Sequence, residues 1–300
     1  MDLSAARIEA AVDEIDPVFL GTPQFVDDGL SSEFGREVVV KVETLNPIGS
    51  FKGRGTSLLA RKLDPTHTWV CTSAGNFGQG LTYAARKLRA TVHVFVSTKV
   101  PPAKVDRMRR LGARVDVHER PETAARERAA ESENCLLVVD GVDPEMAEGA
   151  GTIGVELGSI GEIDTAVVQI GDGALISGVA CWLKNASPRT RILGVCASGA
   201  PAMARSFAAR RPVSVEGTGT IATALAITDP VPESLARVVA LVDEIVLVDD
   251  ADLRAAVELV AASLGLLLEP AGAAGIAALA RHDAAVAGER VAVILTGSGR

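Results

Sequence analysis

Short apolar runs rich in β-branched residues alternate along this chain with helical stretches rich in Ala, Leu and Arg. The runs that predict strands are 38–43, 69–73, 91–97, 114–119, 136–140, 165–171, 191–197 and 291–297. Most are apolar throughout, as expected where helices cover both faces of a sheet. Most are also followed by a helical pattern, so the sequence predicts βαβ units and an α/β fold with parallel sheet.

The pattern also indicates where a site should lie. In open α/β sheets, ligands bind beyond the carboxyl ends of the strands. Residues 1–17 predict an amphipathic helix, and Pro and Gly are spread along the chain, so composition marks no linker between domains.

Composition narrows the class of protein. The 300 residues are 48% hydrophobic and 23% charged, with a mean hydropathy of +0.26, which indicates one or two globular domains and excludes bulk disorder. The formal charge of −8 offers no electrostatic footprint for nucleic acid. Four cysteines without metal-site spacing, no signal-peptide pattern and no apolar run long enough for a membrane span predict a cytoplasmic protein that binds no membrane.

The first candidate segment, residues 46–55, carries Lys52 after a glycine turn and ahead of a helical run expected over 56–63. If Lys52 points inward near a helix N-terminus, desolvation and the helix dipole should lower its pKa. A lysine tuned in this way can form a Schiff base. The alternative is a solvated surface cation.

The second segment, residues 72–80, joins a predicted strand to a helix through small residues. Backbone N–H groups at such a helix start form an anion site, which a carboxylate would suit, and Asn76 and Gln79 add directed hydrogen bonds. The alternative is a plain helix entry with Ser73 as N-cap.

The third segment, residues 171–178, is again a strand, a glycine loop and a helix. It lacks the glycine spacing of a dinucleotide site and the Gly-Lys-Ser/Thr of a P-loop, so a single phosphate held by backbone donors fits better. Asp172 would repel a phosphate unless its side chain points away. The alternative is a tight βα turn.

The fourth segment, 291–300, is an apolar strand that ends in hydroxyl and glycine residues. Taken alone, it indicates only the end of a strand.

Together these segments resemble the fold type II pyridoxal-phosphate enzymes, the tryptophan synthase β superfamily, and within it the serine/threonine dehydratase group. Further matching stretches follow in order and extend the resemblance over nearly the whole chain: TPQF (22–25), GAGTIGVEL (149–157), GVCASGAPAM (194–203), GTIATALAI (219–227) and EPAGAAG (269–275). The resemblance implies two domains, each an open, mainly parallel sheet flanked by helices. Residues 1–67 and 143–300 would form a large cofactor-binding domain, and 68–142 a small mobile domain that binds the substrate carboxylate.

The resemblance also implies roles for individual residues. Lys52 would form the Schiff base with pyridoxal 5'-phosphate and serve as the catalytic residue. The other cofactor-binding residues would be Phe51 against the ring, Asn76 at the ring hydroxyl, Gly171, Asp172, Gly173, Ala174 and Leu175 around the phosphate, and Thr296 at the pyridine nitrogen. The substrate would be bound by Ser73, Ala74, Gly75, Asn76, Phe77 and Gln79.

The implied reaction is a lyase reaction in amino-acid metabolism, of the threonine dehydratase type. A neutral hydroxyl at the ring nitrogen makes the cofactor a weaker electron sink than a carboxylate would, which favours rapid loss of a β-leaving group. Lys52 would take the Cα proton, the cofactor phosphate is a plausible acid for the departing hydroxyl, and the products would be a 2-oxo acid and ammonia. β-Replacement or threonine synthase-like chemistry on the same scaffold, and a catalytically silent relative, remain alternatives. Homodimers are common in the group, so a homodimer is expected.

Departures from the family pattern refine these expectations. Relatives that also racemise carry a serine where this chain has Ala74, which argues against racemisation. Residues 196–200 replace a stretch that helps bind a divalent cation in some dehydratases, so no metal is expected there. The chain stops four residues after Thr296, so no C-terminal regulatory domain is expected. Glu269 is either a carboxylate near the cofactor or an acid facing a helix dipole.

Overall fold

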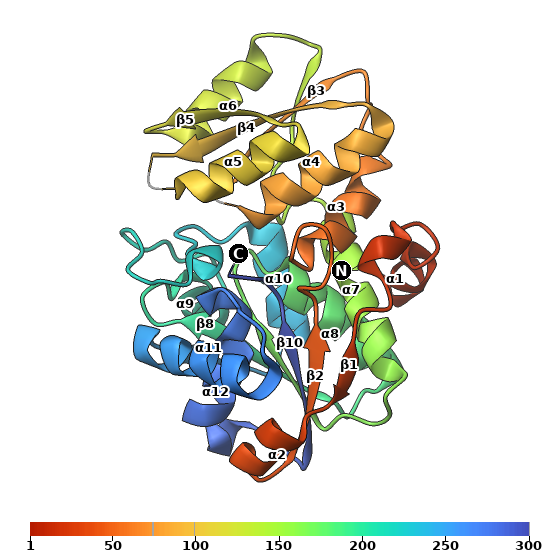
Figure 1. Ribbon diagram of the computed structural model, residues 1–300, viewed down its shortest axis with the longest axis vertical. Coiled ribbons are helices and arrows are strands. Elements are labelled where there is room, and N and C mark those ends of the chain that lie inside the picture. Colours follow the sequence, from red (N-terminus) through yellow and green to blue (C-terminus); the bar gives the residue numbers. More distant parts are fainter. Residues whose placement is uncertain (74, 99, 300) are drawn as a thin grey trace.

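Two separate sheets organise the chain, which a computed structural model describes over residues 1–73, 75–98 and 100–299. The larger sheet has the order β1-β2-β10-β7-β8-β9, and the smaller has the order β5-β4-β3-β6 (Figure 1). Every pairing is parallel except that of β1 with β2. The strands are β1 (Gln24–Val26), β2 (Glu37–Val42), β3 (Thr68–Thr72), β4 (Thr91–Ser97), β5 (Arg114–His118), β6 (Cys135–Leu137), β7 (Thr165–Gln169), β8 (Arg191–Ala197), β9 (Glu244–Val248) and β10 (Arg290–Leu295). The predicted α/β fold with mainly parallel sheets is confirmed.

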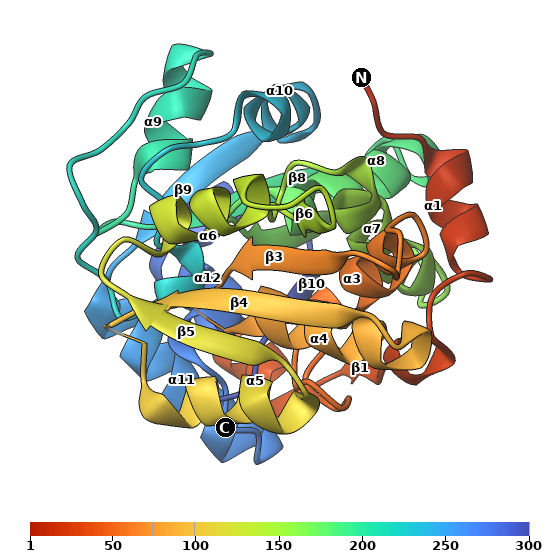
Figure 2. The ribbon, with the colours of Figure 1, turned by 90° about the horizontal axis from the view of Figure 1, so that it is seen from above.

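Helices cover both faces of each sheet. In the smaller sheet α6 lies on one face and α4 and α5 lie on the other (Figure 2). In the larger sheet α8, backed by α7, packs on one face and α12, backed by α11, packs on the other. The helices are α1 (Ala5–Ala11), α2 (Asp28–Phe34), α3 (Lys52–Ala60), α4 (Asn76–Leu88), α5 (Pro102–Leu111), α6 (Pro121–Ala130), α7 (Pro144–Gly158), α8 (Ala174–Ala186), α9 (Ala202–Ala209), α10 (Pro232–Leu241), α11 (Asp250–Leu264) and α12 (Ala274–Arg281), with short 3-10 turns at 17–19, 223–225, 270–273 and 283–285.

Small residues allow the closest helix contact in the molecule. A side chain at Gly178 of α8 would come within 1.8 Å of the Ala147 carbonyl oxygen of α7, so only glycine permits this approach. The strands between the helix layers are almost fully buried, as Val38, Val39 and Val40 of β2 illustrate. The apolar runs in the sequence therefore fill the core.

The differences from the predicted elements are local. All eight predicted strands are present, with ends displaced by a few residues, whereas β1 and β9 were not predicted. The first helix is shorter than expected, because α1 ends at Ala11. The third helix begins at Lys52 and not at Thr56, so Lys52 itself opens α3.

The carboxyl ends of the two sheets converge on one cavity. Its lining includes Ser73 after β3, Asp140 after β6, Asp172 after β7 and Thr296 after β10. Segments far apart in sequence therefore present their polar side chains to a shared space, as parallel strands predict.

Candidate active site

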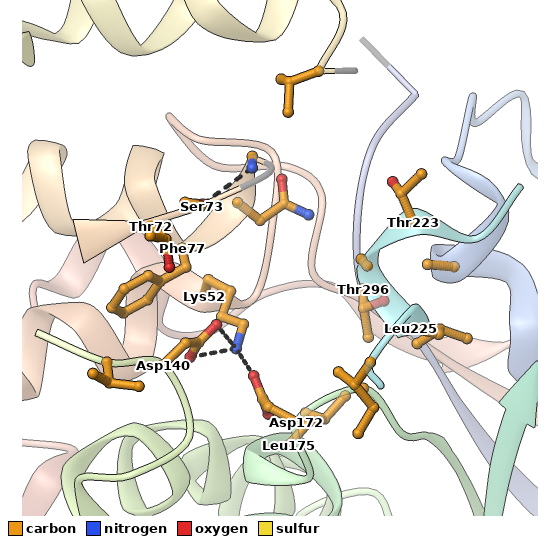
Figure 3. Close-up of a pocket in the computed structure, with 18 of the residues that line it drawn as sticks. Lys52, Thr72, Ser73, Phe77, Asp140, Asp172, Leu175, Thr223, Leu225 and Thr296 are labelled. Atoms are coloured by element: carbon orange, nitrogen blue, oxygen red, sulfur yellow. Dashed lines mark hydrogen bonds and ion pairs between the residues drawn. The ribbon is translucent and has the colours of Figure 1, made fainter. Parts of the chain in front are cut away.

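A cavity of about 400 Å³ brings the four candidate segments together (Figure 3). The predicted site residues that line it are Phe51, Lys52, Ser73, Gly75, Asn76, Phe77, Gly171, Asp172, Gly173, Leu175 and Thr296. Ala174 and Gln79 are buried and do not belong to the described lining. Ala74 lies outside the described residues.

A tightly bonded turn fixes Lys52 at the start of α3. The side-chain amide of Asn46 donates to the carbonyl oxygens of Glu43 and Ser50 and accepts from the Ser50 N–H at 3.3 Å. The Phe51 N–H then donates to the carbonyl oxygen of Thr296 at 3.1 Å, which ties the turn to the end of β10. Asn46 therefore shapes the turn that aims Lys52, a role not predicted from the sequence.

Two carboxylates face the Lys52 ammonium. Nζ lies 2.8 Å from each carboxylate oxygen of Asp140 and also pairs with Asp172. Burial by itself would lower the pKa of Lys52, but the two carboxylates outweigh it and raise this pKa above the ordinary lysine value. The predicted downward shift is therefore wrong, because the two acids, distant in sequence, override desolvation and the dipole.

Asp140 is the site residue that sequence reasoning missed. It follows β6 by three residues, on the segment that leads to α7. Burial and the negative charge of Asp172 raise the pKa of Asp140 to about 7, although Lys52 opposes this rise. The available signal was its position at the carboxyl end of a predicted strand.

Asp172 points toward the lysine. Its Oδ1 accepts the Ala174 N–H at 2.7 Å, and its Oδ2 pairs with Lys52. Burial would raise the pKa of Asp172, but Lys52 and the Ala174 N–H hold this pKa below the ordinary value. The carboxylate therefore occupies a backbone donor at the N-terminus of α8.

Ser73 organises the loop before α4. Its hydroxyl accepts the Gly75 N–H at 3.0 Å and the Gly78 N–H at 2.9 Å. Ser73 thus satisfies a helix-start donor, although Gly75 is the N-cap residue. Because both bonds use lone pairs, the hydroxyl hydrogen can still be donated to a ligand.

The hydroxyl of Thr296 is hydrogen-bonded to the side-chain amide of Gln169. Gln169 Nε2 donates to the Thr296 hydroxyl oxygen at 2.8 Å, so the hydroxyl hydrogen is left for an acceptor in the cavity. Elsewhere in the cavity lining, Asn76 Nδ2 donates to Glu269 Oε1 at 2.7 Å, and Lys104 Nζ lies 3.7 Å from Glu269 Oε2. Glu269 therefore joins the two sheets across the cavity.

The described part of the chain offers neither a metal-binding cluster nor a membrane-spanning helix. Within residues 1–73, 75–98 and 100–299, no group of three or more His, Cys, Asp or Glu side chains is arranged to hold a metal ion. Over the same ranges, no helix is both long and apolar enough to cross a membrane.

Comparisons with known proteins agree on one family. A family model described as pyridoxal-phosphate dependent enzyme matches residues 15–297. Phenylserine dehydratase from Ralstonia pickettii is 35% identical over 284 residues, covering 92% of this chain and 87% of that protein. The biosynthetic L-threonine dehydratase of Lactococcus lactis is 29% identical over 309 residues, covering 98% of this chain and 74% of that protein. The crystal structure of a T.th. threonine deaminase superimposes with a TM-score of 0.93 at 29% identity, covering 99% of each chain.

The groups in the cavity fit pyridoxal phosphate. The Lys52 amine suits an aldehyde, and the Thr296 hydroxyl hydrogen suits a ring nitrogen. The N-terminus of α8 suits a phosphate. The turn before it requires glycine at 171, because a side chain there would come within 2.4 Å of the Ala224 carbonyl oxygen. Asp172 is the one departure, because its carboxylate competes with a phosphate for the Ala174 N–H.

Proposed function

This chain belongs to the family of pyridoxal-phosphate dependent enzymes, and on that premise we propose that it is a lyase that removes water from a β-hydroxy amino acid. L-Threonine and L-serine represent the substrate class, and the products are a 2-oxo acid and ammonia. The proposal is supported by similar proteins named threonine dehydratase, threonine ammonia-lyase and phenylserine dehydratase.

One observation carries the proposal. Lys52 lines the cavity together with Thr296, whose neutral hydroxyl is bonded to the neutral amide of Gln169. We assign the Thr296 hydroxyl to the cofactor ring nitrogen. A neutral partner leaves the ring nitrogen without the support that a carboxylate gives to a protonated ring. Long-lived carbanions are then disfavoured, and departure of a β-substituent is favoured.

The cofactor, when bound, supplies an electrophilic carbon for amines and a conjugated ring that accepts electron density from the substrate Cα. Lys52 would hold the cofactor and, as a free amine, would take the Cα proton of the substrate. Phe51 packs beside the amine, with Lys52 Nζ 5.4 Å from its ring centroid. Asn76 keeps one N–H for the cofactor, because Nδ2 carries two hydrogens and Glu269 uses one.

The loop before α4 binds the substrate carboxylate in this proposal. Ser73 donates its hydroxyl hydrogen, and the N-terminus of the 13-residue helix α4 favours an anion. We propose that residues 68–142 move as a small domain, which would carry this loop onto the substrate and exclude water. The contacts of Glu269 with Asn76 and Lys104 would then hold the closed arrangement.

The proposal also covers the cellular location and the oligomeric state of the protein. The four cysteines are free thiols, which suits a reducing compartment such as the cytoplasm. A homodimer is proposed from the resemblance to the fold type II enzymes.

Product analysis tests the proposed function. The purified protein, loaded with pyridoxal phosphate, is incubated with L-threonine, L-serine or L-phenylserine, and ammonia and 2-oxo acid are measured together. Equal amounts of both products from at least one substrate are expected. A product that forms only after a thiol or amine is added would instead indicate β-replacement, and the lyase proposal would be abandoned.

A further inference from the structure

A proton must reach the hydroxyl that leaves the substrate, and the structure contains a carboxyl group placed to supply it. We propose that Asp140 is the catalytic acid that protonates the departing β-hydroxyl, and that Lys52 restores the proton to Asp140. The inference rests on the proposed function, because only an elimination of water needs such an acid.

Asp140 lies beside the lysine that acts as the base. Asp140 lines the cavity, and both of its carboxylate oxygens lie 2.8 Å from Lys52 Nζ. In Figure 3 its side chain and that of Asp172 approach the lysine nitrogen from two different directions. An acid in direct contact with the base that works at Cα lies close to the neighbouring Cβ substituent of the same substrate.

The backbone around Asp140 is held firmly. Arg237, which is buried, donates from Nη2 to the Val142 carbonyl oxygen at 3.2 Å and from Nη1 to the Gly141 carbonyl oxygen at 3.4 Å. Arg237 is in turn paired with Asp2. These contacts fix the segment directly after Asp140, so the carboxyl group is pre-positioned.

The surroundings decide which acid keeps a proton. The titratable groups that face Asp140 are Lys52 on α3, Asp172 on the turn before α8, and Cys71 on β3, whose own pKa is raised by burial and by Asp140. Two carboxylates share a single lysine, so one of them retains a proton most easily. That one is Asp140, since the pKa of Asp172 is lowered by Lys52 and the Ala174 N–H while the pKa of Asp140 is about 7.

The protons balance over one cycle. Lys52, as a free amine, takes the Cα proton, and the Cβ–O bond breaks with its electron pair moving to oxygen. The Asp140 carboxyl gives its proton to that oxygen, and water departs as the Cα–Cβ double bond forms. Lys52 must lose its ammonium proton before it can bind the cofactor again, and this proton would pass to the Asp140 carboxylate across the 2.8 Å contact, which resets both groups.

A substrate whose leaving group needs no proton can distinguish a catalytic acid from a residue that only supports the structure. For Asp140→Asn, elimination from L-serine should fall by about 100-fold or more, the usual contribution of a general acid, while elimination from β-chloro-L-alanine should fall by less than about fivefold. In the wild type, the L-serine rate should decline at high pH, since the acid form of Asp140 is then lost, and the chloride substrate should lack this decline. Asp140→Glu should restore part of the L-serine rate.

The matched control is Asp143→Asn, which makes the same change three residues further along the same segment and outside the cavity lining. It should leave both rates unchanged within about twofold, because it removes no acid from the site. Equal losses on both substrates in Asp140→Asn would overturn the proposal. An L-serine rate that Asp140→Asn leaves intact would also overturn it, even if the wild type proves to be a dehydratase.

Infrared difference spectra give a readout without turnover. The wild-type protein should show the carbonyl band of a protonated carboxyl group that disappears as pH rises through about 7, and Asp140→Asn should lack it. Absence of this band in the wild type at pH 5 to 6 would overturn the proposal. Absence of 2-oxo acid from every β-hydroxy amino acid would instead overturn the proposed function, so the two failures are distinguishable.

Discussion

Two clusters of charge form around cations of α3 and differ in balance. The Arg54 cluster consists of Arg54 and Lys41 with Glu43 and Glu156, so cations and carboxylates are equal in number. The Lys52 cluster consists of Lys52 with Asp140 and Asp172, so one cation faces two carboxylates. A single residue, Gly53, separates Lys52 from Arg54 along the helix.

The hydrogen bonds of the clusters differ in the same way. Arg54 directs all its N–H groups to partners: Glu43, Glu156, Thr22 and Thr152. Its side chain and that of Glu43 are fully buried. The Lys52 cluster opens onto the cavity, and Asp140 keeps a pKa of about 7. A cluster with equal charges and fully used hydrogen-bond donors stabilises the fold. A cluster with excess carboxylate beside a cavity keeps a proton that can be transferred.

The largest expected effect comes from removing the lysine of the unbalanced cluster. Lys52→Ala should lower elimination by at least about a thousandfold, because it removes both the covalent anchor and the base. Ammonia release under single-turnover conditions measures the loss. Elimination at the wild-type rate would refute the role given to Lys52.

Removing the arginine of the balanced cluster should lower the stability of the fold. Arg54→Met should lower the free energy of unfolding by about 3–5 kcal/mol, because Glu43 and Glu156 lose their main partner in a buried site. Urea denaturation followed by circular dichroism measures the change. Lys52→Met is the control on the same helix and should cost less, since Asp140 can then keep its proton. A larger loss for Lys52→Met would reverse the comparison.

The balanced Arg54 cluster should also make stability depend on pH. Burial would raise the pKa of Glu156, but Arg54 and Lys41 hold it at about 2, below the ordinary 4.5. A depressed carboxyl pKa adds stability that is complete above pH 4.5 and is lost as pH falls through about 2. Relative to Glu156→Gln, the wild type should lose about 3 kcal/mol of unfolding free energy across this interval. Parallel stability curves for the two proteins would contradict the assignment.

The smallest expected effect concerns cofactor affinity. Asp172→Asn should strengthen binding of pyridoxal phosphate by about tenfold, because it removes a negative charge that competes with the phosphate at the start of α8. Fluorescence titration of the apoprotein measures this affinity. Asp229→Asn, which changes an exposed carboxylate at the cavity rim, is the control and should have little effect. Weaker binding to Asp172→Asn would show that this carboxylate helps hold the cofactor.

Local patterns predicted most of the fold. Most of the eight predicted strands were visible because both faces of a parallel sheet are covered, which makes such strands continuous apolar runs. Strands β1 and β9 were missed because they are short edge strands of the larger sheet, with three and five residues. The early start of α3 was missed because glycines at 53 and 55 weaken the helical pattern.

The candidate site was predicted only in part. Ser73, Asn76 and Thr296 stood at or just after the ends of predicted strands, Lys52 stood after a glycine turn, and the structure brings them to one cavity. Asp140 was missed, and with it the direction of the Lys52 pKa. Asp140 lies 88 residues from Lys52, and Asp172 lies 120 residues from it, so their pairing depends on how the two sheets meet.

Reduction with borohydride tests most directly that the unbalanced cluster is the reactive one. The protein is incubated with pyridoxal phosphate and reduced, which converts an imine to a stable secondary amine, and its peptides are analysed by mass spectrometry. Both clusters contain a buried lysine, so Lys52 and Lys41 are compared within one molecule. We expect to find the pyridoxyl group on the peptide that contains Lys52, and we expect Lys41 to be unmodified. Modification of Lys41, or an unmodified Lys52 in protein that has bound the cofactor, would contradict this expectation.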